Sequence, residues 1–172
     1  MLKTSLLFTV SVLLLLVFLP RHFNIQQTSE ISGSYKQIKP LLFDLTHWPH
    51  LMAWHTFSEQ KRIEISTPSN ALGANAFLQT SNANIEISIT ELSQNHLQYS
   101  ALVNNEHTLL GIITLNDNGM SFTISHSLKG TIHSPISGGV VVLYIRSLAD
   151  KMFTSSVNNL RSHIRLEYKD IQ

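Results

Sequence analysis

Three histidines lie close together in and just after the segment KPLLFDLTHWPHLMAW, which runs from Lys39 to Trp54. Histidine is a common zinc ligand, so His47, His50 and His55, with Asp44 as the acid beside them, are candidates for a zinc site. Their spacing differs from the i, i+4 histidine pair of a helical zinc site, and the chain has no cysteine to complete a mixed set. We interpret them as polar residues of a surface turn and predict no metal and no cofactor.

A second candidate is His126, in the segment MSFTISHSL. If this segment is a strand, His126 shares a face with Phe122 and Leu128, because alternate side chains of a strand point the same way. An imidazole on a covered apolar face could orient a ligand or transfer a proton. The commoner arrangement is a buried histidine bonded to a neighbouring hydroxyl group, which Tyr99 or Tyr144 would supply.

No complete catalytic set accompanies these residues. The sequence has no serine, histidine and acid arrangement with motif support, no paired carboxylates on one predicted face and no glycine-rich phosphate loop. We interpret Gly138-Gly139 as the start of a helix rather than as an anion site. A formal net charge of +1, with scattered lysine and arginine, argues against a nucleic-acid partner.

The N-terminal segment from Ser5 to Leu19, SLLFTVSVLLLLVFL, carries no charge. It is shorter than the ~20 apolar residues that span a bilayer, so a signal peptide and a single-pass anchor both stay open. Large residues lead directly into Pro20 where a signal peptidase needs small ones, which favours an uncleaved anchor. We therefore predict a transmembrane anchor or signal segment at 1–23, in the inner (cytoplasmic) membrane if the source is bacterial. One domain, 24–172, follows on the exported side.

The predicted domain begins with a strand and two short helices. Asn24 to Ile31 form the strand, and the serines of Ser32-Gly33-Ser34 can cap a following helix. Apolar residues at three-to-four spacing predict that helix from Tyr35 to Leu45, with Pro40 near its first turn or kinking it. A turn or second short helix spans Trp48 to Trp54.

From Arg62 to Lys129 the apolar period changes to two, which is typical of half-buried antiparallel strands. NDNG at Asn116 to Gly119 predicts a hairpin turn. After Pro135, apolar residues from Ile145 to Ile164 recur at helical spacing and predict one long C-terminal helix. The predicted strands follow the runs at 74–80, 85–90, 97–104, 108–115 and 120–128.

These elements predict an α+β helix-grip fold, in which a curved antiparallel β-sheet wraps around the long C-terminal helix. Two short helices follow the first strand, and the N-terminal membrane segment precedes the domain. A straight helix and a bent sheet cannot touch along their whole length, so we expect a cavity between them. The side chains expected to line it are Trp54, Tyr99, Phe122, His126, Tyr144, Leu148 and Met152.

Four segments resemble a known family: LLFDLTHWPHLMAW, NALGANAFLQT, IEISITELSQNHLQYS and GTIHSPISGG. They look like the polyketide cyclase/dehydrase branch of the START-like (SRPBCC, Bet v 1-like) superfamily, over roughly Ile25 to Ile164. The hallmark is a helix, a tryptophan-proline step and another tryptophan, met here by Trp48, Pro49 and Trp54. In many relatives the second tryptophan follows sooner and precedes a proline, whereas His55 follows here, which implies a differently shaped loop.

The resemblance implies the helix-grip fold but selects no function, because the superfamily includes lipid carriers, hormone receptors and ring cyclases. The two tryptophans are interpreted first as hydrophobic plugs that hold the short helices on the sheet, and second as ligand contacts.

Three functions therefore stay open. The first is a membrane-tethered domain that binds a small hydrophobic ligand (lipid, quinone or polyketide-like) between the sheet and the C-terminal helix. The second is a protein-interaction or structural module whose interior is filled by residues such as Phe122, Met152 and Phe153, so that its structure has no sizeable pocket. The third is a cyclase or lyase-type enzyme that uses His126 as acid or base.

Overall fold

The computed structural model describes residues 18–56, 59–119, 121–134 and 137–169. The predicted membrane segment at 1–23 lies mostly outside these residues. None of the helices in the described ranges is long and apolar enough to cross a membrane.

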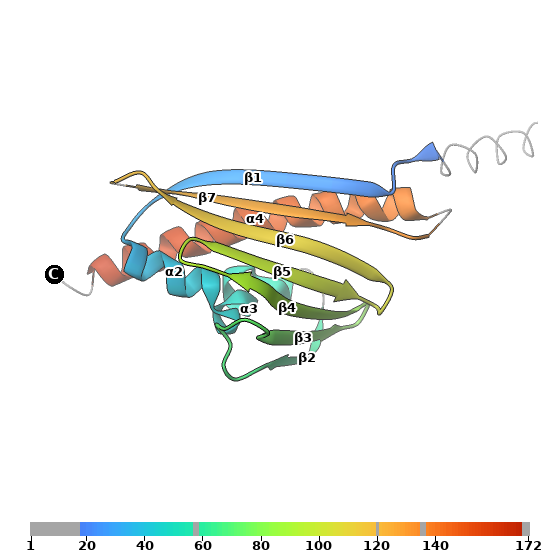
Figure 1. Cartoon of the computed structure of the whole chain (residues 1–172), viewed down its shortest axis with the longest axis horizontal. Coiled ribbons are helices and arrows are strands. Elements are labelled where there is room, and N and C mark those ends of the chain that lie inside the picture. Colours follow the sequence, from blue (N-terminus) through green and yellow to red (C-terminus); the bar gives the residue numbers. More distant parts are fainter. Residues whose placement is uncertain (1–17, 57–58, 120, 135–136, 170–172) are drawn as a thin grey trace, which may run out of the picture.

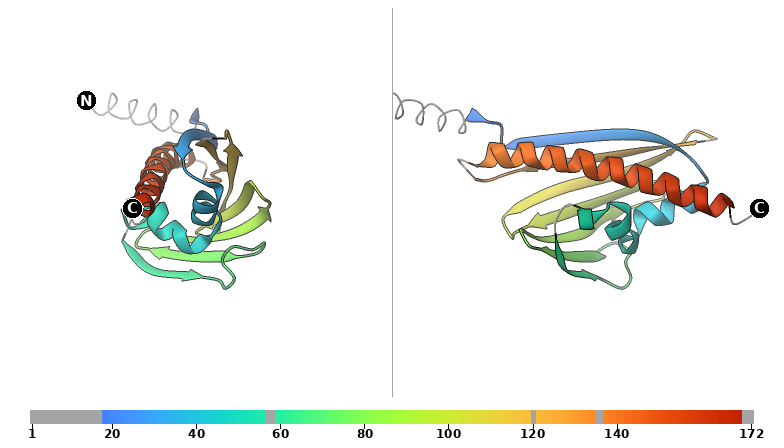
Figure 2. Two further views of the ribbon diagram at one scale, coloured as in Figure 1. Left: turned by 90° about the vertical axis from the view of Figure 1, so that its left-hand side faces the viewer. Right: turned by 180° about the vertical axis from the view of Figure 1, so that it is seen from behind.

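Seven antiparallel strands form one sheet, and it curves around the helices (Figures 1 and 2). Along the sheet the order is β1-β7-β6-β5-β4-β3-β2, so the first strand pairs with the last and all other neighbours are consecutive in the chain. The strands are β1 (His22–Ser32), β2 (Gln60–Ile65), β3 (Asn75–Thr80), β4 (Asn84–Leu92), β5 (His96–Val103), β6 (His107–Asp117) and β7 (Ser121–Thr131).

A long helix, α4 (Gly138–Lys169), crosses the concave face of the sheet (Figure 2). The segment between β1 and β2 covers the rest of that face with α2 (Tyr35–Phe43), η1 (Leu45–His47), α3 (Trp48–Leu51) and η2 (Trp54–Thr56). We call this segment, 35–56, the lid. The predicted α+β helix-grip arrangement of sheet, short helices and C-terminal helix is confirmed.

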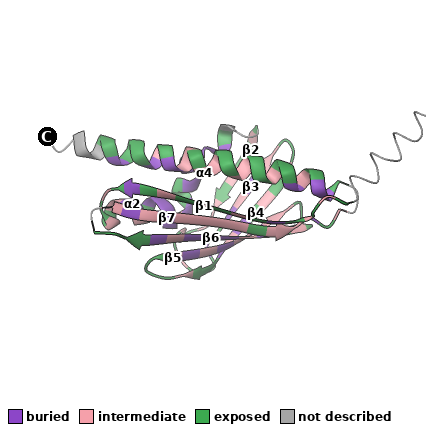
Figure 3. Ribbon diagram, turned by 90° about the horizontal axis from the view of Figure 1, so that it is seen from above, coloured by how far each residue is buried: buried purple, intermediate pink, exposed green. Residues whose placement is uncertain are grey.

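The concave face is apolar because buried and more exposed residues alternate along strands such as β5 and β7. In β5, Leu97, Tyr99 and Ala101 are buried and their neighbours are more exposed. In β7, Phe122 and Ile124 are buried on the same side of the sheet. Buried positions lie between sheet and helices, and α4 keeps its exposed side outward (Figure 3). This single core holds the lid and α4 on the sheet.

Two details differ from the sequence prediction. Helix α2 ends at Phe43 rather than at Leu45, because Asp44 is extended and its carboxylate accepts hydrogen bonds from the Thr46 backbone (2.9 Å) and from the Ser69 hydroxyl (2.8 Å). Burial raises the pKa of Asp44, but the hydrogen bonds from the Thr46 hydroxyl, the Thr46 backbone and Ser69 outweigh it and the net pKa is lowered. Strand β2, QKRIEI, is not among the predicted strand runs. It is a charged strand at the edge of the sheet, and such strands carry a weak apolar pattern.

Candidate functional site

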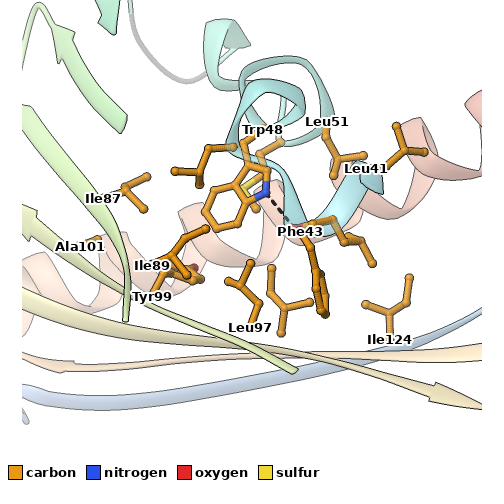
Figure 4. Packing of buried hydrophobic residues seen from close by; sticks show 14 of the residues in the cluster. Leu41, Phe43, Trp48, Leu51, Ile87, Ile89, Leu97, Tyr99, Ala101 and Ile124 are labelled. Carbon is orange, nitrogen blue, oxygen red and sulfur yellow. Dashed lines mark hydrogen bonds between the residues drawn. The ribbon is translucent and has the colours of Figure 1, made fainter. Parts of the chain in front are cut away.

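The lid is fixed by Trp48, which is fully buried. Its indole N–H donates a hydrogen bond of 2.9 Å to the carbonyl of Leu42, and its ring lies edge-on to Tyr99 with the centroids 5.0 Å apart (Figure 4). The polar atom of the ring is thus satisfied inside the core, and the rest of the ring joins α3 to the sheet. Trp48 is a structural plug.

Tyr99 and His126 form a polar side-chain pair on the concave face of the sheet. The Tyr99 hydroxyl lies 2.8 Å from Nε2 of His126, so Tyr99 on β5 supplies the hydroxyl partner. The two strands are not neighbours, because β6 lies between them. On β6, Gly111 pairs with Tyr99, and a Cβ atom there would collide with the tyrosine ring. Gly111 therefore lets the ring lie across β6 and reach β7.

Burial keeps this pair uncharged at neutral pH. It lowers the pKa of His126 from 6.5 to about 4, and it raises the pKa of Tyr99 above its ordinary value. A neutral imidazole has one N–H donor and one acceptor nitrogen, so the pair can hold a polar group of a ligand. A pKa of about 4 makes the imidazole a weak general base at pH 7.

A small space lies beside His126, between the lid, β6, β7 and α4. This inner cavity has a volume of about 20 Å³, close to what one water molecule occupies. The Phe153 ring on α4 faces the imidazole, with the centroids 6.1 Å apart. Most of the lining side chains are apolar. The full lining is Leu42, Leu51, Met52, Ile113, Ile124, His126, Phe153, Ser156, Val157 and Leu160.

A larger space lies between the lid and the C-terminal half of α4. This outer groove measures about 170 Å³ and is lined by Leu41, His47, His50, Leu51, Asn159, Ser162, His163 and Leu166. The side chain of Asn159 ties α4 to α3, since its amide donates to the carbonyls of His50 (3.1 Å) and Leu51 (3.0 Å).

Leu51 lines both the inner cavity and the outer groove. In α2, Leu41 borders the groove and the adjacent Leu42 borders the cavity. In α4, Asn159 borders the groove and the adjacent Leu160 borders the cavity. The two spaces therefore lie on opposite sides of one layer of side chains. Leu51 is the part of that layer that touches both.

The seven residues predicted to line a cavity have different positions. His126 borders the inner cavity, and Tyr99 is bonded to it. Trp54 and Phe122 are buried in the core, but they border neither space. On α4, Leu148 and Met152 are half-buried, whereas Tyr144 is 62% exposed.

The α4 residues predicted to line a cavity lie on a stripe of the helix next to the one that does so. The helix lines the inner cavity with Phe153, Ser156, Val157 and Leu160, whose spacing of i, i+3, i+4 and i+7 marks one helical face. Leu148 and Met152 lie on an adjacent stripe, because one residue rotates a helix by about 100°. Gly111 was also missed, although a glycine inside a strand pattern signals close approach of another group.

His47, His50 and His55 are exposed, in keeping with a surface turn. The first two line the outer groove together with His163 of α4. In the part of the chain that the structure describes, no group of three histidine, aspartate or glutamate side chains is arranged to hold a metal ion.

No family model and no curated protein match the chain. Solved structures match most of its length. A START superfamily protein from Mycobacterium smegmatis has a TM-score of 0.61 at 12% identity, covering 83% of this chain and 97% of that one. Norcoclaurine synthase from Thalictrum flavum, in complex with dopamine and hydroxybenzaldehyde, has a TM-score of 0.61 at 12% identity, with coverage of 83% and 88%.

A ginseng major latex-like protein from Panax ginseng has a TM-score of 0.59 at 8% identity, with coverage of 84% and 98%. Identities this low show the fold alone. The chain therefore has the START-like, Bet v 1-like fold that the sequence resemblance implied. The polyketide cyclase/dehydrase branch within it stays a prediction.

Proposed function

We propose that this protein is a membrane-tethered domain that binds a small, mainly apolar ligand between the sheet and α4. The observation that carries the proposal is the pair of spaces around Leu51: an apolar inner cavity that presents His126, and an outer groove that reaches the surface. An apolar ligand with one polar group fits this chemistry, with that group bonded to the imidazole. A lipid, a quinone or a polyketide-like molecule has such a composition.

Binding requires the side chains between the two spaces to move. Pockets that enclose small molecules usually measure ~300 to 1,000 Å³, whereas the inner cavity has about 20 Å³ and the outer groove about 170 Å³. The residues to be displaced are Leu51, Met52 and Phe153. Met52 is unbranched and repacks readily, and Leu51 belongs to a four-residue helix.

Small-molecule binding has a parallel in the fold. The norcoclaurine synthase structure contains dopamine and hydroxybenzaldehyde, so a protein with this fold holds compact organic molecules. The resemblance to the polyketide cyclase/dehydrase branch also favours a ligand of this kind.

The membrane tether rests on the uncharged run from Ser5 to Leu19. Leu19 packs against Gly139 at the start of α4, where a Cβ atom would collide with the leucine. This contact supports a domain that begins directly after the apolar run. We propose a single-pass anchor, in the cytoplasmic membrane if the source is bacterial, with the domain on the exported side.

Native mass spectrometry of the full chain, extracted from its own host in a mild detergent, tests the ligand. We expect a discrete apolar mass that is released on unfolding. The variant Ser156→Phe fills the inner cavity and should lose that mass. Thr154→Phe makes the same change on the exposed side of the same turn and should retain it. Equal retention in both variants would contradict binding beside His126.

The small inner cavity specifically favours a second candidate, the protein-interaction or structural module with a filled core. A space for about one water molecule is what such a module would show. A protein that carries no releasable mass and binds no added apolar probe would support this candidate. The cyclase or lyase hypothesis has no comparable support, because His126 has a pKa of about 4 and is a weak base at neutral pH.

A further inference from the structure

The start of α4 has an apolar face that points away from the sheet. Val140, Leu143 and Tyr144 are 47%, 54% and 62% exposed, and their spacing of i, i+3 and i+4 places them on one side of the helix. The opposite side, with Val142, is buried in the core. These three residues, together with Phe18, are called the proximal patch below.

The apolar character of this face is confined to the first two turns. The same face continues through Ser147, Lys151 and Thr154, which are all polar and exposed. An amphipathic helix on a globular domain normally has polar residues along its whole outer side. Exposed large apolar side chains that gather in one place indicate an interaction surface.

The proximal patch adjoins the end of the apolar N-terminal run. Phe18, which directly precedes Leu19 at the end of that run, is 82% exposed. Leu19 packs on Gly139, one residue before Val140, so the chain enters the domain at the patch itself (Figure 1). A bilayer that holds Ser5 to Leu19 therefore meets the domain at this end of α4.

The charges around the patch also suit a lipid surface. From 138 to 149 the helix contains one charged residue, Arg146, which is exposed. Arg21 packs against Gly138 at the helix start. Two arginines beside an apolar patch, with no acid in these turns of α4, favour contact with anionic lipid headgroups.

We propose that the proximal patch inserts into the interface of the bilayer that anchors the chain, and so fixes the orientation of the domain. This inference rests on the tether within the proposed function. Asn159 to Leu166 of the outer groove lie about 25 to 35 Å along α4 from Leu143, since a helix rises ~1.5 Å per residue. The outer groove would then lie at the end of the domain farthest from the anchoring membrane. There it could exchange the apolar ligand with a partner on the far side of the domain.

The chain has no cysteine, so single cysteines can carry an environment-sensitive fluorophore without background labelling. The full chain is reconstituted into phosphatidylcholine vesicles containing phosphatidylglycerol, with the label at Leu143→Cys or Tyr144→Cys. The matched controls are Leu72→Cys, at an exposed leucine (69%) between β2 and β3, and Arg165→Cys, at an exposed position near the far end of α4 that borders neither space. Lipids brominated near the headgroup end of the acyl chain then report contact by quenching.

We expect most of the emission of the two patch labels to be lost and the emission of the two controls to be unchanged. Equal quenching at all four positions, or none at the patch, would overturn the inference. If a second copy of the chain covered the proximal patch, the patch labels would be protected from the brominated lipid. Their emission would also change when added lipid diluted the protein in the membrane. That outcome would overturn it as well.

Extraction with alkaline carbonate separates this inference from the proposed function. A chain released from the membrane would contradict the tether itself. A chain that stays in the membrane, with unquenched patch labels, would contradict the proximal patch alone. Ligand release in native mass spectrometry depends on neither result.

Discussion

The Tyr99 hydroxyl and His126 Nε2 are 2.8 Å apart although strand β6 separates their strands. Gly111 makes this possible, because the tyrosine ring occupies the place where a side chain of β6 would lie. The result is a neutral polar pair within the apolar concave face. It gives the inner cavity a hydrogen-bonding group, and burial suppresses the charge on both partners.

A double-mutant cycle measures how much this hydrogen bond contributes to the free energy of unfolding. Tyr99→Phe and His126→Leu should each destabilise the protein by about 1 to 3 kcal/mol, because each leaves the other polar group without its partner. The double variant should cost less than the sum, with a coupling of about 1 kcal/mol. Urea unfolding of the four proteins measures the cycle, and strict additivity would show that the bond contributes nothing to stability.

Gly111→Ala should displace the Tyr99 ring and destabilise the protein by about 1 to 3 kcal/mol, as over-packing does in a dense core. The control is the same substitution in a Tyr99→Leu background, where the ring is absent. There the added methyl group should cost much less. The free energies of unfolding from denaturant titrations decide, and an equal cost in both backgrounds would contradict the role assigned to Gly111.

The long, strongly periodic elements of the fold could be predicted from the sequence. The stripe from Ile145 to Ile164 defines α4, and the alternation in β5 and β7 defines the apolar face of the sheet. The end of α2 could not be placed, because it depends on contacts of Asp44 with Ser69, which is distant in sequence.

The site was predictable only in part. Alternation places His126 on the covered face, but its partner depends on how far a ring reaches across β6, which no local pattern encodes. Leu51 lies in the quoted tryptophan-rich motif, yet its position between two spaces results from how the lid meets α4. The size of the inner cavity depends on side-chain packing and cannot be read from apolar periodicity.

Stability should fall between about pH 6.5 and pH 4 because of His126. Burial lowers its pKa from 6.5 to about 4, so in this range the unfolded chain binds a proton that the folded protein does not. The free energy of unfolding therefore decreases as the pH falls through this window, by an amount on the order of 3 kcal/mol, and this contribution is constant below it. Above about pH 6.5 the residue contributes no pH dependence.

Urea midpoints measured across that window in wild type and in His126→Leu provide the check. The variant should lack this component and have a flatter profile. Other groups, including Asp44, add their own pH dependence at lower pH, and they are common to both proteins. Parallel profiles for the two proteins would contradict a buried neutral His126.

Leu51 separates the inner cavity from the outer groove and lines both. Leu51→Ala should join the inner cavity to the outer groove and strengthen the binding of a small apolar fluorophore such as aminoanthracene by about tenfold, which corresponds to ~1.4 kcal/mol. The same substitution should destabilise the protein by roughly 2 to 5 kcal/mol, because a buried leucine is truncated.

Leu45→Ala is the matched control, since Leu45 is a fully buried leucine of the lid that borders neither space. It should lose a similar amount of stability without the gain in binding. Fluorescence titrations of the membrane-reconstituted proteins, with protein-free vesicles as the blank, compare the two variants. If both bind the fluorophore equally, loosening of the core explains the binding. If only Leu51→Ala gains affinity, the passage between groove and cavity runs past Leu51, and the lid is the part of the fold that a ligand must move.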